Sequence, residues 1–513
     1  MPRIFHLSNT SSPEDKEKNE AAIEGIAAYL TQHSTPVELT RPPKQGNPKE
    51  GEKLFKNRGC LGCHSIEKFG ASDFAPNLSG MGSKTTPEWI YTWIRNPRHY
   101  HLNTRMPNLR LTDEEAADVT AYLLTFRNPE FEAAPVPEAK PAVVDEMILH
   151  FMRAKLRKEE AVAELSQMDP QAKLVYLGEK MITNQGCFAC HEIDGFKDAK
   201  PIGTELSNEG AKEVERLDFG FIPIERTRQA WFFQKLKEPR IFDQGKIKDY
   251  FEKLKMPQFE FTDGEAHALT TFLLSQVQEP IPAGMERRLN LKEQEIESGR
   301  LLVAKLNCQG CHVLDGKGGK IKELLEDPGA SPPPLEGEGA KVQEAWLYQF
   351  LREPSTIRPW LQIHMPTFDF THEEITALIK FFSNLAKQDI FFEGIKPEAH
   401  VEPTPENLAA GKKLFEMFQC AKCHEPKKGA ALGTSFLAPN LTLAKTRLKP
   451  QWIVDWLKDP QALQAGTMMP GFFPGGQSPA PDMLGGDAAK QIEAIRNYLM
   501  QYNPEAEKPA AKK

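Results

Sequence analysis

The sequence lacks three features, and each absence excludes a class of protein. No apolar run approaches the ~20 residues that a membrane-spanning helix needs, so no span is predicted. Basic residues do not outnumber acidic ones: 64 against 71 gives a net charge of −7, whereas nucleic-acid-binding proteins are normally basic. Cysteine is scarce, with 8 in 513 residues, which excludes a disulfide-dense scaffold.

What is present suits several folded domains. At about 150 residues per domain, a chain of 513 residues predicts three or four of them. Apolar residues make up 40% and charged residues 26%, which excludes wholesale disorder. The 41 prolines are about 8% of the chain against a usual ~5%, which predicts many stiff connections.

All eight cysteines belong to four copies of one motif, Cys-x-x-Cys-His. The copies are Cys60, Cys63 and His64; Cys187, Cys190 and His191; Cys308, Cys311 and His312; Cys420, Cys423 and His424. The motif is an attachment site for c-type haem. Two thiols on one helical turn add to the two vinyl groups of a porphyrin, and the adjoining histidine offers a nitrogen to the iron. The sequence therefore predicts four covalently bound haem c groups.

Two other uses of Cys-x-x-Cys fit this chain poorly. A redox dithiol of the thioredoxin type needs one motif in a βαβ setting and does not require the histidine. A zinc ribbon needs two motifs ~15–20 residues apart. Here successive motifs are separated by more than 100 residues, so a zinc ion would have to be shared between whole domains.

A longer repeat surrounds each motif. A glycine lies nine residues before each first cysteine, and downstream a tryptophan is followed eight residues later by a proline. The glycines are Gly51, Gly178, Gly299 and Gly411; the pairs are Trp89 and Pro97, Trp231 and Pro239, Trp346 and Pro354, Trp452 and Pro460. Apolar residues at helical spacing precede the cysteines, and the tryptophan segment predicts an amphipathic helix that ends before proline.

Each repeat then contains Met-Pro and a final helix that begins with acidic residues. The methionines are Met106, Met256, Met365 and Met469, and a further Met-Pro stands at Met1. Proline disfavours helix for the residue before it, which holds methionine in an extended loop from which its thioether can reach a metal. Thr112, Thr262 and Thr371 are the expected N-caps of three final helices.

The order of these elements resembles the class I cytochrome c family. Two copies also keep Ala-Pro-Asn-Leu, at 75–78 and 438–441; the third keeps Pro334-Leu335, and the second is reduced to Leu206. The resemblance implies that each copy is a small all-helical domain around one haem, with the Met-Pro methionine as sixth ligand. The expected fold is thus all-α, a tandem array of class I cytochrome c-like haem domains joined by proline-rich linkers.

The repeat predicts the domain limits. The predicted domains are 48–127, 172–278, 293–388 and 405–503, with a linker at 128–171 that holds a charged helix at about 143–167, and a disordered tail at 504–513. Residues 1–33 match the last third of another such domain, because Tyr29 follows Met1 at nearly the distance at which Tyr498 follows Met469. This segment contains no basic stretch followed by an apolar run, the pattern of an export signal, so we expect the chain to be a fragment, or a mispredicted start, of a longer exported protein. The alternative is an accidental Met-Pro at a genuine start.

The resemblance also assigns the iron ligands, with two points of competition. The expected pairs are His64 with Met106, His191 with Met256, His312 with Met365, and His424 with Met469. Met468 competes with Met469, which alone precedes proline and lies nine residues after Pro460, as Met106 lies nine after Pro97. His364 competes with Met365, because imidazole also binds haem iron, and the repeat register favours methionine.

Electron transfer is the leading functional hypothesis: four His/Met-ligated haems would relay electrons between partners of a respiratory chain. The expected partners are other redox proteins, namely a quinol-oxidising membrane complex, a terminal oxidase or reductase, or a small cytochrome. Nucleic acid is not expected, and association with a membrane complex would use parts absent from this chain. The expected location is periplasmic or otherwise extracytoplasmic, because haem c is attached outside the cytoplasm.

Two alternatives stay open at this point. In the first, the chain is an enzyme, a peroxidase or reductase in which one iron loses its methionine and exposes an open site; the intact Met-Pro motifs make this less favoured. In the second, the chain is one electron-carrying part of a large membrane-attached complex in which catalysis occurs elsewhere. Spacing does not give the haem potentials or the direction of electron flow.

Overall fold

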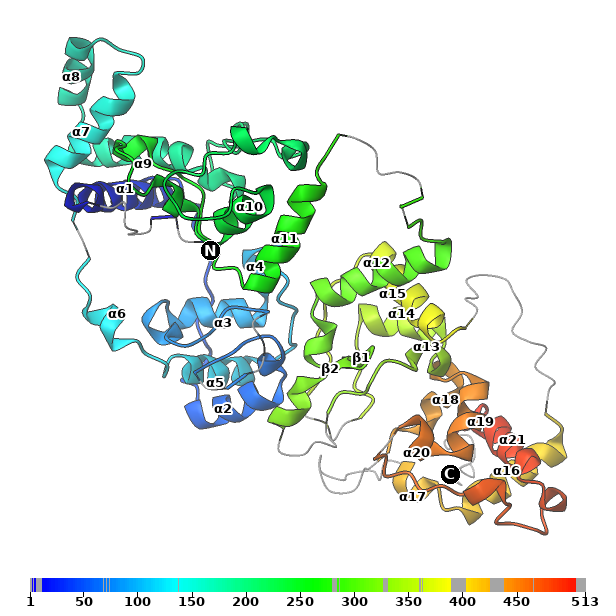
Figure 1. Cartoon of the computed structure of the whole chain (residues 1–513). Coiled ribbons are helices and arrows are strands. Elements are labelled where there is room, and N and C mark those ends of the chain that lie inside the picture. The colour runs from blue at the N-terminus through cyan, green and yellow to red at the C-terminus, as the bar shows by residue number, and fades with distance from the viewer. Residues whose placement is uncertain are drawn as a thin grey trace. The chain divides into compact units, whose positions relative to one another are not determined.

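A computed structural model gives an all-α architecture, which confirms the predicted fold class (Figure 1). The structure describes the whole chain except residues 1, 3, 6–11, 68, 71, 73, 137, 279–283, 286, 326–330, 359–360, 362, 389–402, 425–437, 465 and 504–513. The predicted tail at 504–513 and the methionine of the first Met-Pro therefore lie outside the described residues. The chain divides into two compact units, Met1–Pro36 with Ala134–Arg287, and Val37–Ala133 with Arg288–Lys513.

The second unit contains the first, third and fourth repeats. Its longer helices are α2 (Pro48–Asn57), α3 (Pro87–Arg95), α5 (Asp113–Leu123), α12 (Leu291–Lys305), α14 (Glu344–Arg352), α15 (His372–Leu385), α16 (Pro405–Met417), α19 (Pro450–Lys458) and α21 (Ala488–Leu499). Its short helices are α4 (Pro97–Tyr100), α6 (Pro129–Ala133), α13 (Glu338–Lys341), α17 (Ala421–His424), α18 (Ala444–Arg447) and α20 (Pro460–Leu463). Strands β1 (Val313–Leu314) and β2 (Lys317–Gly318) form one small antiparallel hairpin with Val313 opposite Gly318.

Each repeat of this unit is built on a pair of crossed helices, α2 with α5, α12 with α15, and α16 with α21. The repeated glycine lies at the crossing. A Cβ placed on Gly51 would lie 2.0 Å from the Asp118 carbonyl oxygen, and one on Gly411 would lie 2.1 Å from that of Ala494. At Gly299 the nearest atom would be the Phe381 Cβ, at 2.1 Å. Any side chain at these positions would force the two helices apart.

The final helices begin where the sequence predicts. Thr112, Thr262 and Thr371 each form a capping box, in which the threonine hydroxyl accepts a hydrogen bond from the backbone of a glutamate three residues on. The glutamate side chain accepts one in return from the threonine backbone N–H. The three predicted N-caps are confirmed, and each fixes the first turn of a helix that closes a repeat.

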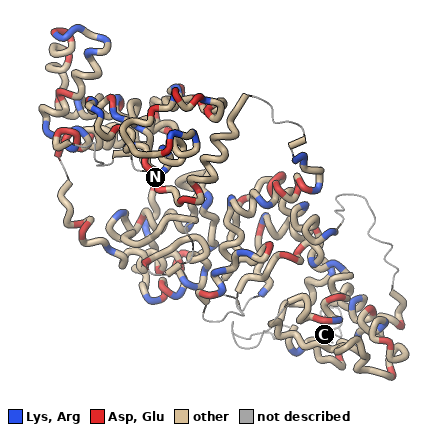
Figure 2. The backbone as a smooth tube through the Cα atoms, viewed as in Figure 1, with Lys and Arg blue, Asp and Glu red and all other residues tan. Residues whose placement is uncertain are grey.

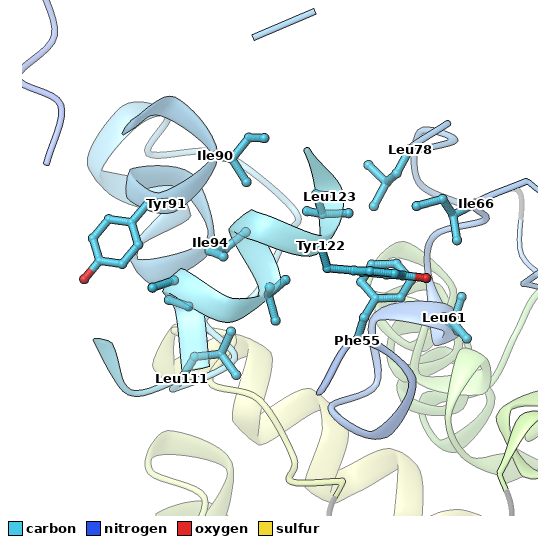
Figure 3. Packing of buried hydrophobic residues seen from close by; sticks show 13 residues of the cluster. Phe55, Leu61, Ile66, Leu78, Ile90, Tyr91, Ile94, Leu111, Tyr122 and Leu123 are labelled. Atoms are coloured by element: carbon cyan, nitrogen blue, oxygen red, sulfur yellow. The ribbon is translucent and has the colours of Figure 1, made fainter. Parts of the chain in front are cut away.

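The core of the first repeat shows how the elements meet (Figure 3). Phe55 of α2 packs against Tyr122 of α5, with ring centroids 5.6 Å apart. Ile90 and Ile94 of the tryptophan helix α3 cover one side of this pair, and Leu61 approaches from the Cys-x-x-Cys turn on another. Apolar residues of α2, α3, α5 and the cysteine turn therefore share one core.

The first unit contains α1 (Pro13–Gln32), α7 (Pro141–Met152), α8 (Lys158–Ser166), α9 (Pro170–Gln185), α10 (Arg228–Lys237) and α11 (Asp263–Ser275). Helix α9 leads to the second motif, and it crosses α1, where a Cβ on Gly178 would lie 2.1 Å from the Gly25 carbonyl oxygen and 2.8 Å from the Tyr29 Cβ. Helix α1 therefore crosses α9 at the repeated glycine in the same way as α5 crosses α2. Helix α11 packs on α10 and on the turn at Glu209–Ala211.

The segment predicted as one charged helix at about 143–167 contains two helices, α7 and α8. Helix α7 is largely apolar, and Met147, Ile148 and Met152 are buried in a core shared with α1 and α9. The charged residues gather in the connection and in α8 (Figure 2). This segment is therefore packed against the second repeat and is more than a spacer.

Acidic and basic residues, which are nearly equal in number, are interspersed along the chain (Figure 2). Among the helices that the structure describes, none combines the length and apolar character of a membrane span.

Candidate haem-binding sites

Each Cys-x-x-Cys-His motif forms one tight helical turn. The backbone N–H of the histidine donates to the carbonyl of the first cysteine in every copy, at 2.9 Å for His64 and His312 and at 3.1 Å for His191 and His424. This bond spans four residues, so the first cysteine and the histidine lie on the same side of the turn. All eight cysteines lie within the described residues, and none of them forms a disulfide.

The residue before each first cysteine has a left-handed backbone. Its φ is +91° at Gly59, +70° at Gly186, +53° at Asn307 and +58° at Gln419. Glycine adopts this conformation at no steric cost, and asparagine tolerates it better than most residues do. The left-handed residue ends the preceding helix and starts the cysteine turn. The Cys-x-x-Cys-His motif does not itself indicate that the residue before it must have a positive φ.

Three of the four motif histidines are held in one tautomer. The Nδ1–H of His64 donates to the Pro76 carbonyl at 2.8 Å, that of His312 to Pro333 at 2.7 Å, and that of His424 to Pro439 at 2.7 Å. A carbonyl oxygen only accepts, so the proton must be on Nδ1 and the lone pair on Nε2. Burial lowers the pKa of all three imidazoles, which favours the neutral form that binds a metal.

The second motif differs. His191 is exposed, and its ring makes no hydrogen bond within the described residues. The proline that accepts in the other repeats is missing here, and Leu206, the remnant of that segment, is 49% exposed. The turn of Cys187 and Cys190 is intact, but the structure does not fix the imidazole beside it.

Most of the motif thiols are protonated at neutral pH. Burial raises the pKa of Cys60 and of Cys311 to about 12, and that of Cys308 and Cys420 to about 11. Redox dithiols and zinc sites use thiolates, which an apolar setting disfavours. In the described part of the chain, no three His, Cys, Asp or Glu side chains lie together as a metal cluster.

Two of the Met-Pro methionines are oriented by a tryptophan. The indole N–H of Trp93 donates to the Met106 sulfur at 2.9 Å, and that of Trp456 donates to the Met469 sulfur at 2.7 Å. These tryptophans lie one turn after Trp89 and Trp452 and stack on them, with centroids 5.4 Å and 5.0 Å apart. They were not predicted as site residues, although a second tryptophan four residues on is visible in the sequence of two repeats.

The two candidate methionines of the fourth repeat differ in burial. Met468 is 67% exposed, whereas Met469 packs against the core of its repeat. Met365 likewise packs against the core of the third repeat. His364, beside it in the chain, is also half-buried, and burial, followed by the charges of Arg58 and Arg110 from the first repeat, lowers the pKa of its imidazole. For Met256 the structure shows a half-buried side chain in a loop.

A group of charged side chains surrounds the third motif. Lys341 pairs with the Glu338 carboxylate at 3.3 Å. The charges of Glu338, Arg358 and Lys341 all act on the imidazole of His312. Arg447 enters from helix α18 of the fourth repeat and places its guanidinium 5.1 Å from the centre of the Trp346 ring.

The basic cluster, which we define as Lys341, Arg358 and Arg447, has more positive than negative charge. Burial, together with the charge of Arg447, lowers the pKa of Arg358 to about 10. Neither arginine forms an ion pair with any residue that the structure describes, and the Arg447 Nε is buried without a partner there. One carboxylate, Glu338, faces three cations, which is an unfavourable arrangement unless anions are added.

These residues fit a covalently bound haem. At three motifs the chain offers two thiols on one turn, an imidazole with its Nε2 lone pair free, and a thioether in a Met-Pro loop. At the third motif the two arginines that lack an ion pair among the described residues match the two negative propionates that a haem carries. At the second motif the thiols fit, but the imidazole is not oriented. The arrangement can bind iron through nitrogen and sulfur.

An all-α chain with repeated thiol and imidazole sites of this kind defines a class of proteins that bind haem c. The family model described as Cytochrome c matches residues 48–127, 280–386 and 408–503, which together exceed half of the chain. The chain belongs to the cytochrome c family and carries class I domains in tandem. It is thus an electron-transfer protein with covalently bound haem c. The predicted domain at 172–278 lies outside the three matched ranges.

Individual relatives match single domains. The chain is 31% identical to Cytochrome c of Ginkgo biloba over 16% of this chain and 88% of the relative. It is 25% identical to a nitric oxide reductase subunit of Stutzerimonas stutzeri over 18% of this chain and 68% of the relative. It is 30% identical to Cytochrome c oxidase subunit 2 of Bacillus subtilis (strain 168) over 15% of this chain and 25% of the relative. No solved structure matches the chain.

Proposed function

We propose that the chain carries four haem c groups and relays electrons between redox proteins of a respiratory chain. The proposed attachment residues are the four cysteine pairs, and the proposed iron ligands are His64 and Met106, His191 and Met256, His312 and Met365, and His424 and Met469. Bound haem supplies a one-electron couple between ferric and ferrous iron. The observation that carries the proposal is the bond from three imidazole Nδ1 atoms to proline carbonyls, which leaves Nε2 for iron.

The side chains have distinct tasks in such a relay. Imidazole and thioether side chains that the fold holds in place would keep the reorganisation small when a bound haem changes its oxidation state. Trp93 and Trp456 orient two of the thioethers through their indole N–H groups. The basic cluster would hold the propionates of the third haem, and Lys341 and Arg358 come from the same repeat as that haem.

The partners that we propose are other redox proteins, among them a quinol-oxidising membrane complex, a terminal oxidase or reductase, or a small cytochrome. Two relatives bear the names of an oxidase subunit and a reductase subunit, which supports partners of this kind. Charged residues of both signs, interspersed along the chain, suit brief docking. We propose a periplasmic or otherwise extracytoplasmic location, because haem c is attached there.

A count of haem per chain tests the proposal. The full chain should yield four haem c groups, each recovered by mass spectrometry on a peptide that holds one Cys-x-x-Cys-His motif. The oxidised protein should show low-spin ferric haem by electron paramagnetic resonance. A chain that binds no haem, or that binds it without thioether bonds, would contradict the proposal.

A second candidate function is suggested by the second motif. Because His191 is exposed and unbonded within the described residues, its iron is the one most open to loss of a ligand and to binding of a small molecule. An enzyme of the peroxidase or reductase type would use such a site. It predicts a high-spin ferric signal that cyanide abolishes and that disappears in the double variant Cys187→Ala, Cys190→Ala. Four low-spin haems in the native chain would exclude it.

A further inference from the structure

Two of the cysteine turns contact each other in the second unit, although about 250 residues separate them in the chain. A Cβ placed on Gly62 would lie 2.8 Å from the Cys311 sulfur, and one placed on Gly310 would lie 2.3 Å from the Gly62 carbonyl oxygen. These two glycines occupy the same position in their motifs. Only glycine at both positions allows the turns to approach this closely.

Asn307 joins the two turns by hydrogen bonds. Its side-chain Nδ2 donates to the Gly62 carbonyl at 2.9 Å and to the Cys63 sulfur at 3.3 Å. A residue of the third repeat thus contacts a sulfur that carries the cofactor of the first repeat. The equivalent residue in the first repeat is Gly59, which has no side chain to return the contact.

The Met-Pro loops of the same two repeats also pair. The backbone N–H of Asn108 donates to the Thr367 carbonyl, and that of Thr367 donates to the Asn108 carbonyl, both at 2.9 Å. Each residue lies two positions after its methionine, Met106 or Met365. The two repeats therefore meet through equivalent segments, cysteine turn with cysteine turn and methionine loop with methionine loop.

Charged side chains of the first repeat hold this contact in place. Arg110 donates to the Met365 carbonyl at 2.6 Å and also to the Pro354 carbonyl. Arg98 donates to the Phe368 carbonyl at 2.9 Å and forms an ion pair with Asp369 at 3.2 Å. The bonds to the third repeat's backbone are charge-assisted, which makes them stronger than neutral ones.

We propose that these segments form a junction through which the first and third repeats exchange electrons directly. The inference rests on the proposed function, because it requires haem at both motifs. Haem c is bonded to its cysteine sulfurs, so contact between the turns brings together two sulfurs, Cys63 and Cys311, that belong to different cofactors. One electron leaves one iron and enters the other, so that the first is oxidised and the second reduced, with no proton moved and no bond formed or broken.

The junction couples two repeats that are not adjacent in the chain. The second repeat belongs to the other unit of the chain. Within the second unit, the third repeat contacts the first through the junction and the fourth through a backbone bridge between Val342 and Leu448. The coupling order in this unit is first, third, fourth.

The variant Gly310→Lys tests the junction. The fourth motif has Lys422 at this position and the second has Ala189, so the motif itself tolerates a side chain there. At Gly310 the lysine has no room and must separate the turns. Ala189→Lys is the matched control, since Ala189 is exposed and lies in the other unit. Asn307→Gly is a milder second variant, which keeps the left-handed backbone and removes both bonds of the amide.

Electron paramagnetic resonance of the fully oxidised full-length chain is the first measurement. In the native chain two ferric signals should be broadened by mutual interaction, and Gly310→Lys should sharpen them while Ala189→Lys leaves them broad. After partial photoreduction, transfer between these two haems should slow by about tenfold or more in Gly310→Lys. Asn307→Gly should also sharpen the ferric signals and slow the transfer between the two haems. If Gly310→Lys does not attach haem, Asn307→Gly is the variant that tests the junction.

The results separate this inference from the proposed function. A native chain with haem at every motif whose signals add as independent haems would overturn the junction alone. Signals and transfer rates that are unchanged in both Gly310→Lys and Asn307→Gly would also overturn the junction. A native chain that lacks haem at the first or third motif would overturn the proposed function instead.

Discussion

At the scale of single residues, the hydrogen bond between the imidazole and a proline carbonyl fixes the state of the histidine, which the motif alone does not. A Cys-x-x-Cys-His motif supplies the imidazole, but a free ring populates two tautomers and many orientations. The carbonyls of Pro76, Pro333 and Pro439 select one tautomer and one orientation. Such partners of a ligand raise its basicity and fix its approach to the metal.

Substitution of the fourth-repeat methionines distinguishes a ligand from its neighbour. Met469→Ala should leave the haem attached, because the cysteines are untouched, and should remove one methionine–iron absorption band. Met468→Ala is the matched control, since that side chain is 67% exposed and should leave every band in place. Optical spectra of the oxidised chains are the measurement. Loss of the band in the control, or its retention in Met469→Ala, would contradict the assignment.

The sequence predicts individual residues unevenly, for a physical reason. Cysteines and histidines that react with the cofactor must stand at fixed spacing, so Cys60 or His424 can be found from spacing alone. Trp93 and Trp456 were missed because an indole that orients a methionine looks, in sequence, like any apolar residue of an amphipathic helix. The left-handed Asn307 was missed because its role depends on backbone geometry and on a distant turn.

At the scale of helices, the crossed pair is the unit that repeats. A glycine at each crossing lets two backbones approach until a Cβ would clash with a carbonyl. The same contact between Gly178 and Gly25 places α1 on α9, far from it in the chain. The sequence predicted that residues 1–33 resemble a final helix, and the structure shows which helix it packs against. Pairing of this kind depends on surface shape, which periodicity does not encode.

Gly411→Ala should weaken the fourth repeat. The added methyl would lie 2.1 Å from the Ala494 carbonyl oxygen, so helices α16 and α21 must separate, at a cost of about 1–3 kcal/mol. Urea unfolding followed by tryptophan fluorescence measures the loss. Gly264→Ala is the control, because that helical glycine has open space around it and alanine should change stability by no more than about 1 kcal/mol. Equal effects of the two substitutions would contradict the crossing argument.

The crossed helices of the third repeat should show an acid-dependent contact. Lys380 of α15 donates to the Glu295 carboxylate of α12 at 2.8 Å, and Asn384 donates to the other oxygen at 2.8 Å. The Lys380 bond, with help from Asn384, holds the pKa of Glu295 below its ordinary value. A lowered pKa stabilises the folded form above the unfolded value of about 4.3, and that contribution disappears as the pH falls through the folded pKa.

Glu295→Gln should therefore lower stability at neutral pH and have no effect in acid. The pair is partly exposed, so the loss at pH 7 should be below about 1 kcal/mol. Urea midpoints of native and variant chains, measured from neutral to acid pH, should converge as the pH falls. Glu297→Gln on the same helix is the control, since Glu297 pairs with Arg300 one turn away and does not join the two helices. If the difference in urea midpoint between the native chain and Glu295→Gln grows as the pH falls, the pKa of Glu295 is not lowered in the folded chain and the prediction is wrong.

At the scale of the whole molecule, chain length predicts several domains but not their contacts. Repeats three and four meet by the antiparallel bridge between Val342 and Leu448, flanked by Arg447 over the Trp346 ring and Lys341 over the Trp452 ring. The arrangement is reciprocal, since Lys341 and Arg447 each lie five residues before the tryptophan of their own repeat. No local pattern shows that each of these basic residues will lie over the tryptophan of the other repeat. In the sequence, each looks like any lysine or arginine on a protein surface.

Arg447→Met should lower the midpoint potential of one haem. A nearby cation favours the reduced, less positive iron. Arg447 is half-buried over the Trp346 ring of the third repeat, and it forms no ion pair among the described residues. Its removal should shift one potential downward by on the order of 59 mV, a tenfold change for a one-electron couple. Spectroscopic redox titration of the full chain measures the shift. Arg447→Lys keeps the charge and should retain most of the potential.

The matched control for charge alone is Lys458→Met, on helix α19 of the same repeat, where the lysine side chain is 55% exposed and pairs with Asp455. Solvent screens that charge, so its loss should leave every potential nearly unchanged. If both substitutions shift a potential equally, the effect is one of net charge and the basic cluster has no special role. If Arg447→Met shifts none, Lys341 and Arg358 suffice, and the fourth repeat does not tune the haem of the third. A downward shift confined to Arg447→Met means that a residue of one repeat sets the redox potential of the haem in its neighbour, so the interface between the two repeats tunes the relay.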